Sequence, residues 1–317
     1  MATLWAMAEN PLDILRSMLG SRGPGLEIGP LHRPVAPKRD GYQVEILDHA
    51  GVEDLRAKYS KDPNVDVSTI EDVDYVSDGR PMLDIIGERE KFDWLVASHV
   101  IEHTPDMIGF LKDCEALLRP GGRLVMAVPN RRFCFDALRP LTSMGELLQA
   151  HHEKRSRHTA GAIYDFISEY STRDGAGAWG EGHPGQLTRS NPAAAAWRAF
   201  QASVCSTDYV DTHAWVFVPA SFRLLIETTW ELGLLKLREA AYHPTIGCEF
   251  FVTLSEDGIG PRMSSDALRR AAEEEQLAGL LERFNLLPGC QQTGPADAPG
   301  GEAVGNLVVN QLRAVRN

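Results

Sequence analysis

The segment 99–103 (HVIEH) places two histidines and a glutamate within five residues. Imidazole titrates near neutral pH, so His99 or His103 could remove a proton from a hydroxyl or an amine that is about to react. Glu102 could orient one of these imidazoles or form part of a metal-assisted site. The structural alternative is that Glu102 and His103 only fix this turn to neighbouring backbone. Among the catalytic roles, we predict His99 as the first candidate for a base and His103 as the second.

The same five residues match the HxxEH pattern of zinc peptidases, in which two histidines on one helix bind the metal. That alternative needs a continuous helix from His99 to His103. His99 instead lies near the end of an apolar segment, residues 92–100 (FDWLVASHV), so we expect the helix to begin after it. The sequence marks no third ligand. A zinc peptidase is therefore the less favoured function, and we expect no metal site.

Aspartates follow two other apolar segments that are typical of strands. Asp48 ends residues 42–48 (YQVEILD), and it lies about 20 residues beyond the first strand candidate, where an acidic side chain of a nucleotide-binding fold accepts both ribose hydroxyls. Asp78 follows the next strand candidate, with Asp72 and Asp74 as close competitors for its role. The alternative for each is a solvated aspartate at a strand end. The spacing favours Asp48 as a ligand of a ribose.

The first strand candidate runs directly into a turn, residues 26–34 (LEIGPLHRP). A dinucleotide-binding turn needs three glycines so that its backbone can approach a pyrophosphate. This segment supplies only Gly29 in that register. The sequence therefore argues against NAD and FAD.

Strand and helix candidates alternate between residues 21 and 130, which predicts a doubly wound, mostly parallel α/β sheet with helices on both faces. The strand candidates in this part are residues 25–30, 42–48, 73–79, 92–100 and 121–130, and the clearest helix candidates are 51–63 and 105–118. Later in the chain, a helix is expected within 218–235 and an antiparallel strand pair at 235–244 and 248–257. The carboxyl ends of the parallel strands should bring their polar residues to one edge.

The alternation of strands and helices stops after the fifth strand candidate. The segment that follows contains a Gly-rich stretch and patterns typical of loops and helices, which predict an inserted lid. We divide the chain into five parts: a helical lead-in (residues 1–20), a core (21–130), the lid (131–210), the end of the core (211–257), and a C-terminal helix with a mobile tail (258–317). A basic run in the lid (HHEKRSRH) and the segment after it supply candidate substrate ligands, although charged runs are also common on solvated helices. These candidates are Glu153, Arg155, Arg157, His158, Asp211, His213 and Trp215.

Two regions together resemble the class I S-adenosylmethionine-dependent methyltransferases. Residues 26–34 are similar to motif I, and residues 92–130, with their late RPGG turn, are similar to motifs IV and V. Residues 211–222 (DTHAWVFVPASF) add a weaker match. The likeness covers roughly the first 130 residues, and it implies a seven-stranded sheet with S-adenosylmethionine as the cofactor.

The resemblance also implies roles for individual residues. Glu27 would approach the ammonium group of the cofactor, and Gly29 would let the loop pass close to its methionyl part, although Gly29-Pro30-Leu31-His32-Arg33 departs from the usual GxGxG. Asp48 would bind the ribose and Asp78 would lie near the adenine amine. The turn that starts at Ser98 would line the sulfonium end and the acceptor pocket. The cofactor-binding candidates are therefore Glu27, Gly29, Pro30, Asp48, Asp78 and Ser98.

The expected reaction is methyl transfer to a small-molecule or glycan acceptor, at oxygen, with a histidine as the base. The alternative is a catalytically degenerate member of the fold that acts as a binding scaffold, which the sparse glycines of motif I favour. A net charge of −12 argues against nucleic acid as a partner. Five scattered cysteines and the lack of a long apolar segment predict a cytoplasmic protein without a membrane span, and a homo-oligomer is left open.

Overall fold

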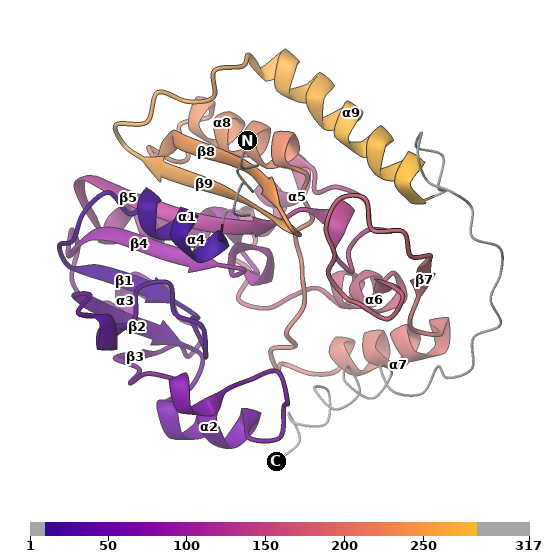
Figure 1. The fold of residues 1–317 in the computed structure, drawn as a ribbon, viewed down its shortest axis with the longest axis horizontal. Coiled ribbons are helices and arrows are strands. Elements are labelled where there is room, and N and C mark those ends of the chain that lie inside the picture. The colour runs from indigo at the N-terminus through magenta and orange to yellow at the C-terminus, as the bar shows by residue number, and fades with distance from the viewer. Residues whose placement is uncertain (1–9, 284–317) are drawn as a thin grey trace, which may run out of the picture.

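A seven-stranded sheet forms the centre of the computed structural model, which describes residues 10–283 (Figure 1). Its strand order is β3-β2-β1-β4-β5-β9-β8. The five strands from β3 to β5 are parallel, and β9 is antiparallel to both of its neighbours. The strands are β1 (Gly25–Ile28), β2 (Val44–Asp48), β3 (Tyr75–Val76), β4 (Phe92–Ser98), β5 (Leu118–Pro129), β8 (Arg238–Ile246) and β9 (Glu249–Ser255). The predicted doubly wound, mostly parallel sheet is confirmed.

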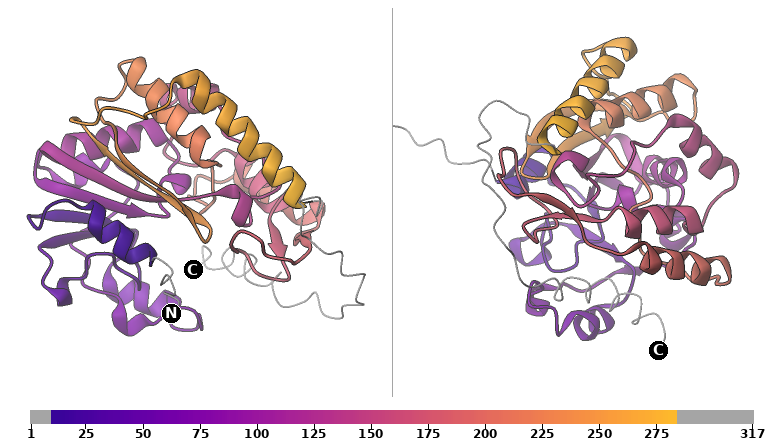
Figure 2. Two further views of the ribbon diagram at one scale, coloured as in Figure 1. Left: turned by 45° about the horizontal axis from the view of Figure 1, so that its top comes forward. Right: turned by 90° about the vertical axis from the view of Figure 1, so that its right-hand side faces the viewer.

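Helices cover both faces of this sheet. On one face, α3, α4 and α8 pack against the sheet through residues such as Met82, Leu111 and Phe222. On the other face, Ile14 and Leu15 of α1 pack against β4, β5 and β9. The helices of the core are α1 (Pro11–Met18), α2 (Val52–Tyr59), α3 (Met82–Ile86), α4 (Met107–Leu117), α8 (Pro219–Glu231) and α9 (Ser265–Arg283), with short 3-10 turns η1 (Lys38–Asp40) and η2 (Val67–Thr69). Figure 2 shows α9 running alongside α8.

Local sequence signals account for several of these helix starts. The Asn10 side chain accepts a hydrogen bond from the N–H of Leu12, and Pro11 occupies the first turn of α1, where its missing N–H costs nothing. Asp106 caps α4 in the same way through the N–H of Gly109. The beginning of the predicted lead-in, with Leu4 and Met7, and the predicted C-terminal tail lie outside the described residues.

Residues between β5 and α8 form the inserted segment that the sequence predicts as a lid. Its elements are η4 (Arg131–Phe133), α5 (Met144–His152), α6 (Ala160–Ser168), β6 (Ser171–Arg173), β7 (Leu187–Arg189) and α7 (Ala193–Val204). α6 and α7 pack through Ile163, Ile167, Ala196 and Ala199. They lie on the side toward which β1 and β4 point (Figure 1). The small β6–β7 hairpin was not predicted, because strands of three residues joined by a Gly-rich loop carry too short a pattern.

The RPGG segment has a different place from the one expected. It lies inside β5, where the pairing with β4 shifts between Phe92 and Trp94, rather than ending the helix before a separate strand. Gly121 adopts a left-handed φ of 75° at this irregularity, which a glycine accommodates without strain. None of the helices within residues 10–283 is long and apolar enough to cross a membrane.

Candidate active site

The carboxyl ends of β1, β2 and β4 lie level with one another. Ile28 of β1 pairs with Leu47 on one side and with Ala97 on the other. The residues that follow these three, Gly29, Asp48 and Ser98, therefore come to the same edge of the sheet. In open α/β sheets this edge is where ligands bind. The structure thus brings together three of the predicted cofactor residues.

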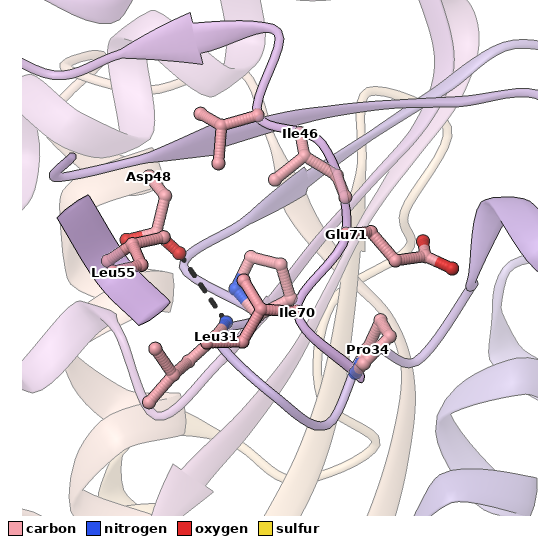
Figure 3. Close-up of a pocket in the computed structure, with 9 residues that line it drawn as sticks. Leu31, Pro34, Ile46, Asp48, Leu55, Ile70 and Glu71 are labelled. Carbon is pink, nitrogen blue, oxygen red and sulfur yellow. Dashed lines mark hydrogen bonds between the residues drawn. The ribbon is translucent and has the colours of Figure 1, made fainter. Parts of the chain in front are cut away.

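Asp48 presents a buried carboxylate at this edge, only 4% exposed. Its Oδ2 accepts a hydrogen bond of 3.4 Å from the N–H of Leu31, and its Oδ1 accepts bonds of 2.7 Å from the backbone and ring nitrogens of His49. Beside it a narrow crevice runs between the loop after β1 and the end of β2 (Figure 3). The crevice is lined by Pro30, Leu31, Pro34, Ile46, Asp48, Leu55, Ile70, Glu71 and Val73. Since the His49 side chain is half exposed, its ring can yield Oδ1 to the hydroxyl of a ligand.

Gly29 makes the turn after β1 with a left-handed φ of 64°. A Cβ atom built on Gly29 would lie 3.4 Å from Cγ2 of Val100, so the turns after β1 and β4 lie against each other. Leu31 also has a positive φ, of 46°, and Pro30 and Leu31 form one wall of the crevice. Gly29 thus gives this turn a backbone conformation that residues with side chains rarely adopt.

Glu27 lies on the opposite face of the sheet from Leu26 and Ile28, because side chains alternate along a strand. Its carboxylate is buried and accepts hydrogen bonds from the N–H groups of Val35, at 2.6 Å, and Ala36, at 3.0 Å. Burial outweighs these two bonds and raises the pKa of Glu27 to about 7. In the described structure, Glu27 therefore holds the far end of the loop that begins at Gly29.

The raised pKa of Glu27 predicts a pH-dependent stability. The folded protein keeps a proton on Glu27 that the unfolded chain loses at lower pH, so the stabilisation falls as pH rises through about 7. This group should lower the free energy of unfolding by on the order of 3 kcal/mol between about pH 5 and about pH 8. Urea unfolding at both pH values measures the change. Glu27→Gln, which cannot titrate, should show a smaller change, and an identical change in both proteins would contradict the assignment.

The turn after β4 carries the predicted catalytic residues. Ser98 is the last residue of β4, and His99 follows it with a left-handed φ of 53°, which is unusual for a residue with a side chain. A single 3-10 turn, η3 (Ile101–His103), comes next. No continuous helix joins His99 to His103, as the sequence predicts, so the helical zinc-peptidase arrangement is not formed.

Glu102 lies at the centre of a histidine cluster. Its side chain is fully buried, and neither carboxylate oxygen has a hydrogen-bond partner. Three ring nitrogens face Oε1: Nδ1 of His99 at 3.5 Å, Nε2 of His103 at 3.9 Å and Nε2 of His213 at 3.9 Å. The first two histidines come from the turn after β4, while His213 comes from the segment that returns from the inserted lid.

Each of the three imidazoles uses its other nitrogen to contact a second carboxylate. Nε2 of His99 lies 2.6 Å from Glu249, Nδ1 of His103 lies 2.8 Å from Asp211, and Nδ1 of His213 lies 2.5 Å from Asp136. We call the set Glu102, His99, His103 and His213, with these three outer carboxylates, the histidine cluster. The outer carboxylates fix each ring so that the remaining nitrogen faces Glu102.

The cluster shifts the pKa values of its members. Burial alone would lower the pKa of His99, but its two carboxylate neighbours raise that pKa well above the ordinary value. Burial likewise opposes the charged form of His103, and Asp211 and Glu102 overcome it and raise its pKa. Burial favours a raised pKa for Glu102, but the nearby imidazoles lower it. These shifts favour protonated rings at His99 and His103 beside an ionised Glu102.

Backbone hydrogen bonds tie the returning segment to the turn after β4. The N–H groups of Ala214 and Trp215 both donate to the carbonyl oxygen of Glu102, at 2.8 and 3.3 Å. Nε1 of Trp215 donates to the carbonyl oxygen of Thr104 at 2.6 Å. Trp215 is 4% exposed and belongs to the main core, so it anchors this junction. These bonds hold His213 in place against Glu102.

The structure separates the other predicted substrate residues into two groups. His158 is buried next to the cluster, with Nε2 at 3.3 Å from the hydroxyl of Tyr209, and burial lowers its pKa to about 4. Tyr209 in turn donates to the carbonyl oxygen of His103. Arg155 instead pairs with Glu153 at 2.6 Å, and Arg157 donates to the carbonyl oxygen of Ser206. Both arginines thus make contacts within the inserted segment.

Asp78 lies two residues beyond Val76, the β3 residue that pairs with Asp48. Its half-exposed carboxylate pairs with Arg80 at 2.8 Å, and this contact lowers its pKa. Its competitor Asp74 is engaged elsewhere, because it accepts hydrogen bonds from Lys38 and from the N–H of Ile46. The role of Asp78 at the adenine stays a prediction, with Asp72 as its remaining competitor.

Sequence reasoning missed Asp136 and Glu249 as partners of the predicted histidines. They lie 77 residues before His213 and 150 residues after His99, respectively. No local pattern marks such pairs. An aromatic group around His213 was also missed: its ring centroid lies 4.7 Å from that of Phe135 and 5.7 Å from that of Phe166, and Phe135 stacks on Tyr170.

Known proteins are similar to parts of this chain in sequence. A family model described as a methyltransferase domain matches residues 7–174. The ubiquinone biosynthesis O-methyltransferase of Methylocella silvestris is 33% identical over 129 residues, which are 39% of this chain and 43% of that protein. The protein of the same name from Rhodopseudomonas palustris strain TIE-1 is 44% identical over 57 residues, 18% of this chain and 22% of that protein. The chain thus spans less than half the length of these relatives.

Among solved structures, an S-adenosylmethionine-dependent methyltransferase from Mesorhizobium loti aligns at 13% identity with a TM-score of 0.39, over 76% of this chain and 95% of that one. The family match itself extends over more than half of the chain, from the helical lead-in through β6. It includes the turn after β1, Asp48 and the turn after β4. The chain belongs to the methyltransferase domain family.

Proposed function

We propose that this enzyme transfers the methyl group of S-adenosylmethionine to an oxygen atom of a small-molecule or glycan acceptor. The observation that carries the proposal is the edge formed by Gly29, Asp48 and Ser98, which continues directly into the histidine cluster. The side of this edge at Asp48 suits a nucleoside, and the side at the histidine cluster suits a hydroxyl group that must lose a proton. The matched relatives are named as O-methyltransferases, which supports oxygen as the atom that is methylated.

The residues at the edge fit the cofactor in type and position. Asp48 would accept hydrogen bonds from the ribose hydroxyls, and Asp78 would lie at the adenine end. The turn at Gly29 and Pro30 would follow the methionyl part, with Glu27 shaping this loop from behind. Ser98 would lie near the sulfonium. When bound, the cofactor supplies a methyl group that is already activated as an electrophile.

The chain's remaining task is to align the acceptor and to take up its proton. We propose that His99 and His103 meet the acceptor oxygen at the start of the histidine cluster, and that the buried Glu102 orients their rings. His99 is a poor free base in the described arrangement, because carboxylates face both of its ring nitrogens. The four carboxylates of the cluster outnumber its three imidazoles, so they raise the pKa of His99 and of His103, which favours uptake of the acceptor's proton by the cluster.

The half-buried aromatic side chains beside His213 favour a planar acceptor with a hydroxyl group. Phe135 and Phe166 contact this ring and Tyr170 stacks on Phe135, whereas Arg155 and Arg157 contact the inserted segment itself. An anionic acceptor is therefore less well matched than a hydroxylated ring.

Phe166→Leu should raise the KM for a hydroxylated aromatic acceptor by up to about tenfold, because one ring contact contributes roughly 0.5–1.5 kcal/mol. The affinity for S-adenosylhomocysteine should stay unchanged, since Phe166 lies on the acceptor side. Steady-state kinetics and calorimetry measure the two effects. An equal loss of affinity for acceptor and cofactor would argue for a general disturbance of the fold instead.

The direct test of the function is a panel of phenols, catechols, glycans and amines incubated with methyl-labelled S-adenosylmethionine. Mass spectrometry should show the mass of one methyl group added to a hydroxylated acceptor. The Asp48→Ala enzyme serves as the control and should give no product. Methylation of amines alone would overturn transfer to oxygen.

A further inference from the structure

We propose that Glu102, His103 and His213 bind one divalent transition-metal ion of the zinc type, with His99 beside it. One carboxylate oxygen of Glu102, one ring nitrogen of His103 and one of His213 all lie within 4.8 Å of one another. Ligands about 2.0–2.1 Å from a tetrahedral metal lie about 3.3 Å apart, so the observed 3.9 Å between Oε1 and each Nε2 needs only a small inward movement.

The state of Glu102 is the first independent argument for a ligand at this place. Its carboxylate is 0% exposed, and both oxygens lack a hydrogen-bond partner. A buried carboxylate with no partner is costly, and native proteins pair such groups with a cation or with hydrogen-bond donors. The three imidazoles all lie at or beyond 3.5 Å from Oε1, which leaves room for an ion between them.

The outer carboxylates give the second argument. Histidines that bind metals usually donate their other ring N–H to a carboxylate, which fixes the ring and makes it a better ligand. His103 has this partner in Asp211 and His213 has it in Asp136, each through Nδ1. Both rings therefore present Nε2 to Glu102. The arrangement of an aspartate, an imidazole and Glu102 in a row thus occurs twice around one carboxylate.

The ligand set indicates which ions fit. Two imidazoles and one carboxylate suit zinc and neighbouring transition metals, whereas magnesium and calcium prefer oxygen ligands throughout. Three protein ligands are also the number found in catalytic zinc sites, where the fourth position stays open to water or substrate. His103 and Asp211 are partly exposed, so the open position can face the acceptor side.

The role of this ion rests on the proposed function, although the site itself does not. An ion beside the acceptor would make its hydroxyl more acidic and hold its oxygen in place. The ion would also supply the positive charge that four carboxylates around three imidazoles favour. With the ion bound, His103 would hold it through Nε2 instead of acting as a simple base.

Metal binding by the full chain tests the proposal. The protein is stripped with a chelator and then given zinc, with elemental analysis after gel filtration, or cobalt(II), with visible spectroscopy. We expect one ion per chain and the intense visible bands of four-coordinate cobalt. Glu102→Gln and His213→Asn should each weaken zinc binding at least about 100-fold. His151→Asn is the matched control, because His151 also pairs with an aspartate, Asp106, outside the cluster, and this variant should bind zinc like the parent.

Calorimetry with S-adenosylhomocysteine shows that each variant is folded and separates the two proposals. The metal site is overturned if the parent protein binds S-adenosylhomocysteine but takes up no zinc or cobalt. It is also overturned if Glu102→Gln and His213→Asn bind zinc and cobalt as tightly as the parent does. If the stripped enzyme methylates its acceptor at the full rate, the role of the ion is overturned as well. Stoichiometric zinc without transfer to any hydroxyl would leave the site standing and overturn the proposed function.

Discussion

Asp48→Ala is expected to weaken the binding of S-adenosylhomocysteine at least about 100-fold. The buried carboxylate lies at the edge where β1, β2 and β4 end, and it is the residue we assign to the ribose hydroxyls. A hydrogen bond to a charged group contributes about 1.5–3 kcal/mol, so losing two of them costs at least about 3 kcal/mol. Isothermal calorimetry on the purified proteins measures the affinity directly.

Two further variants make this result specific. Asp48→Asn keeps the size of the side chain but not its charge, and it should fall between the parent and Asp48→Ala. Asp78→Ala removes a carboxylate that is half exposed and paired with Arg80, so it should reduce the affinity only a few fold. Equal affinities for the parent and for Asp48→Ala would contradict the placement of the ribose.

Asp136→Ala is expected to lower the free energy of unfolding by about 3–5 kcal/mol. Asp136 is 1% exposed, and it accepts hydrogen bonds of 2.7 Å from Arg139 and 2.5 Å from the His213 ring. These partners outweigh burial and lower the pKa of Asp136 to about 2. Its removal would leave the buried guanidinium of Arg139 without a counter-charge. Urea unfolding followed by circular dichroism measures the change.

A surface pair provides the comparison for this variant. Glu53 and Arg56 form an exposed ion pair along α2, and Glu53→Ala should change the free energy of unfolding by less than about 1 kcal/mol. If Asp136→Ala does not fold, Asp136→Asn keeps the shape and one acceptor oxygen, and it should unfold at an intermediate urea concentration. A change of the same small size in Asp136→Ala and Glu53→Ala would contradict the buried charge network.

Short-range patterns predicted the frame of the site. Strands that are buried on both faces give continuous apolar segments, and their carboxyl ends in a parallel sheet must meet at one edge. This argument predicted that Asp48 and the turn at His99 lie at the same edge of the sheet. It also argued against a continuous helix through 99–103, because the apolar segment before it is typical of a strand, and the structure agrees.

Contacts over long distances in the sequence were not predictable in the same way. His213 reaches Glu102 only because the segment after the inserted lid returns along the turn after β4, and two backbone bonds to Glu102 hold it there. The metal site was not expected, because the third ligand lies 110 positions from His103 and carries no local signature. Asp136 and Glu249 escaped notice for the same reason.

Side-chain direction was the other limit. The sequence could place Glu27 on β1 but not show that both of its oxygens bind the amides of Val35 and Ala36. The basic run in the lid suggested ligands for an acceptor, yet Arg155 finds its counter-charge two residues away in Glu153. A charged residue in a local ion pair of this kind already has its counter-charge without a substrate.

A crystal structure of the enzyme with S-adenosylhomocysteine tests the account most directly. We predict the ribose on Asp48, the amino-acid part along the turn at Gly29, and the sulfur atom pointing from Ser98 toward Glu102 and its histidines. A ligand bound away from the carboxyl ends of β1, β2 and β4, with the Asp48 carboxylate still held by His49 and Leu31, would contradict it.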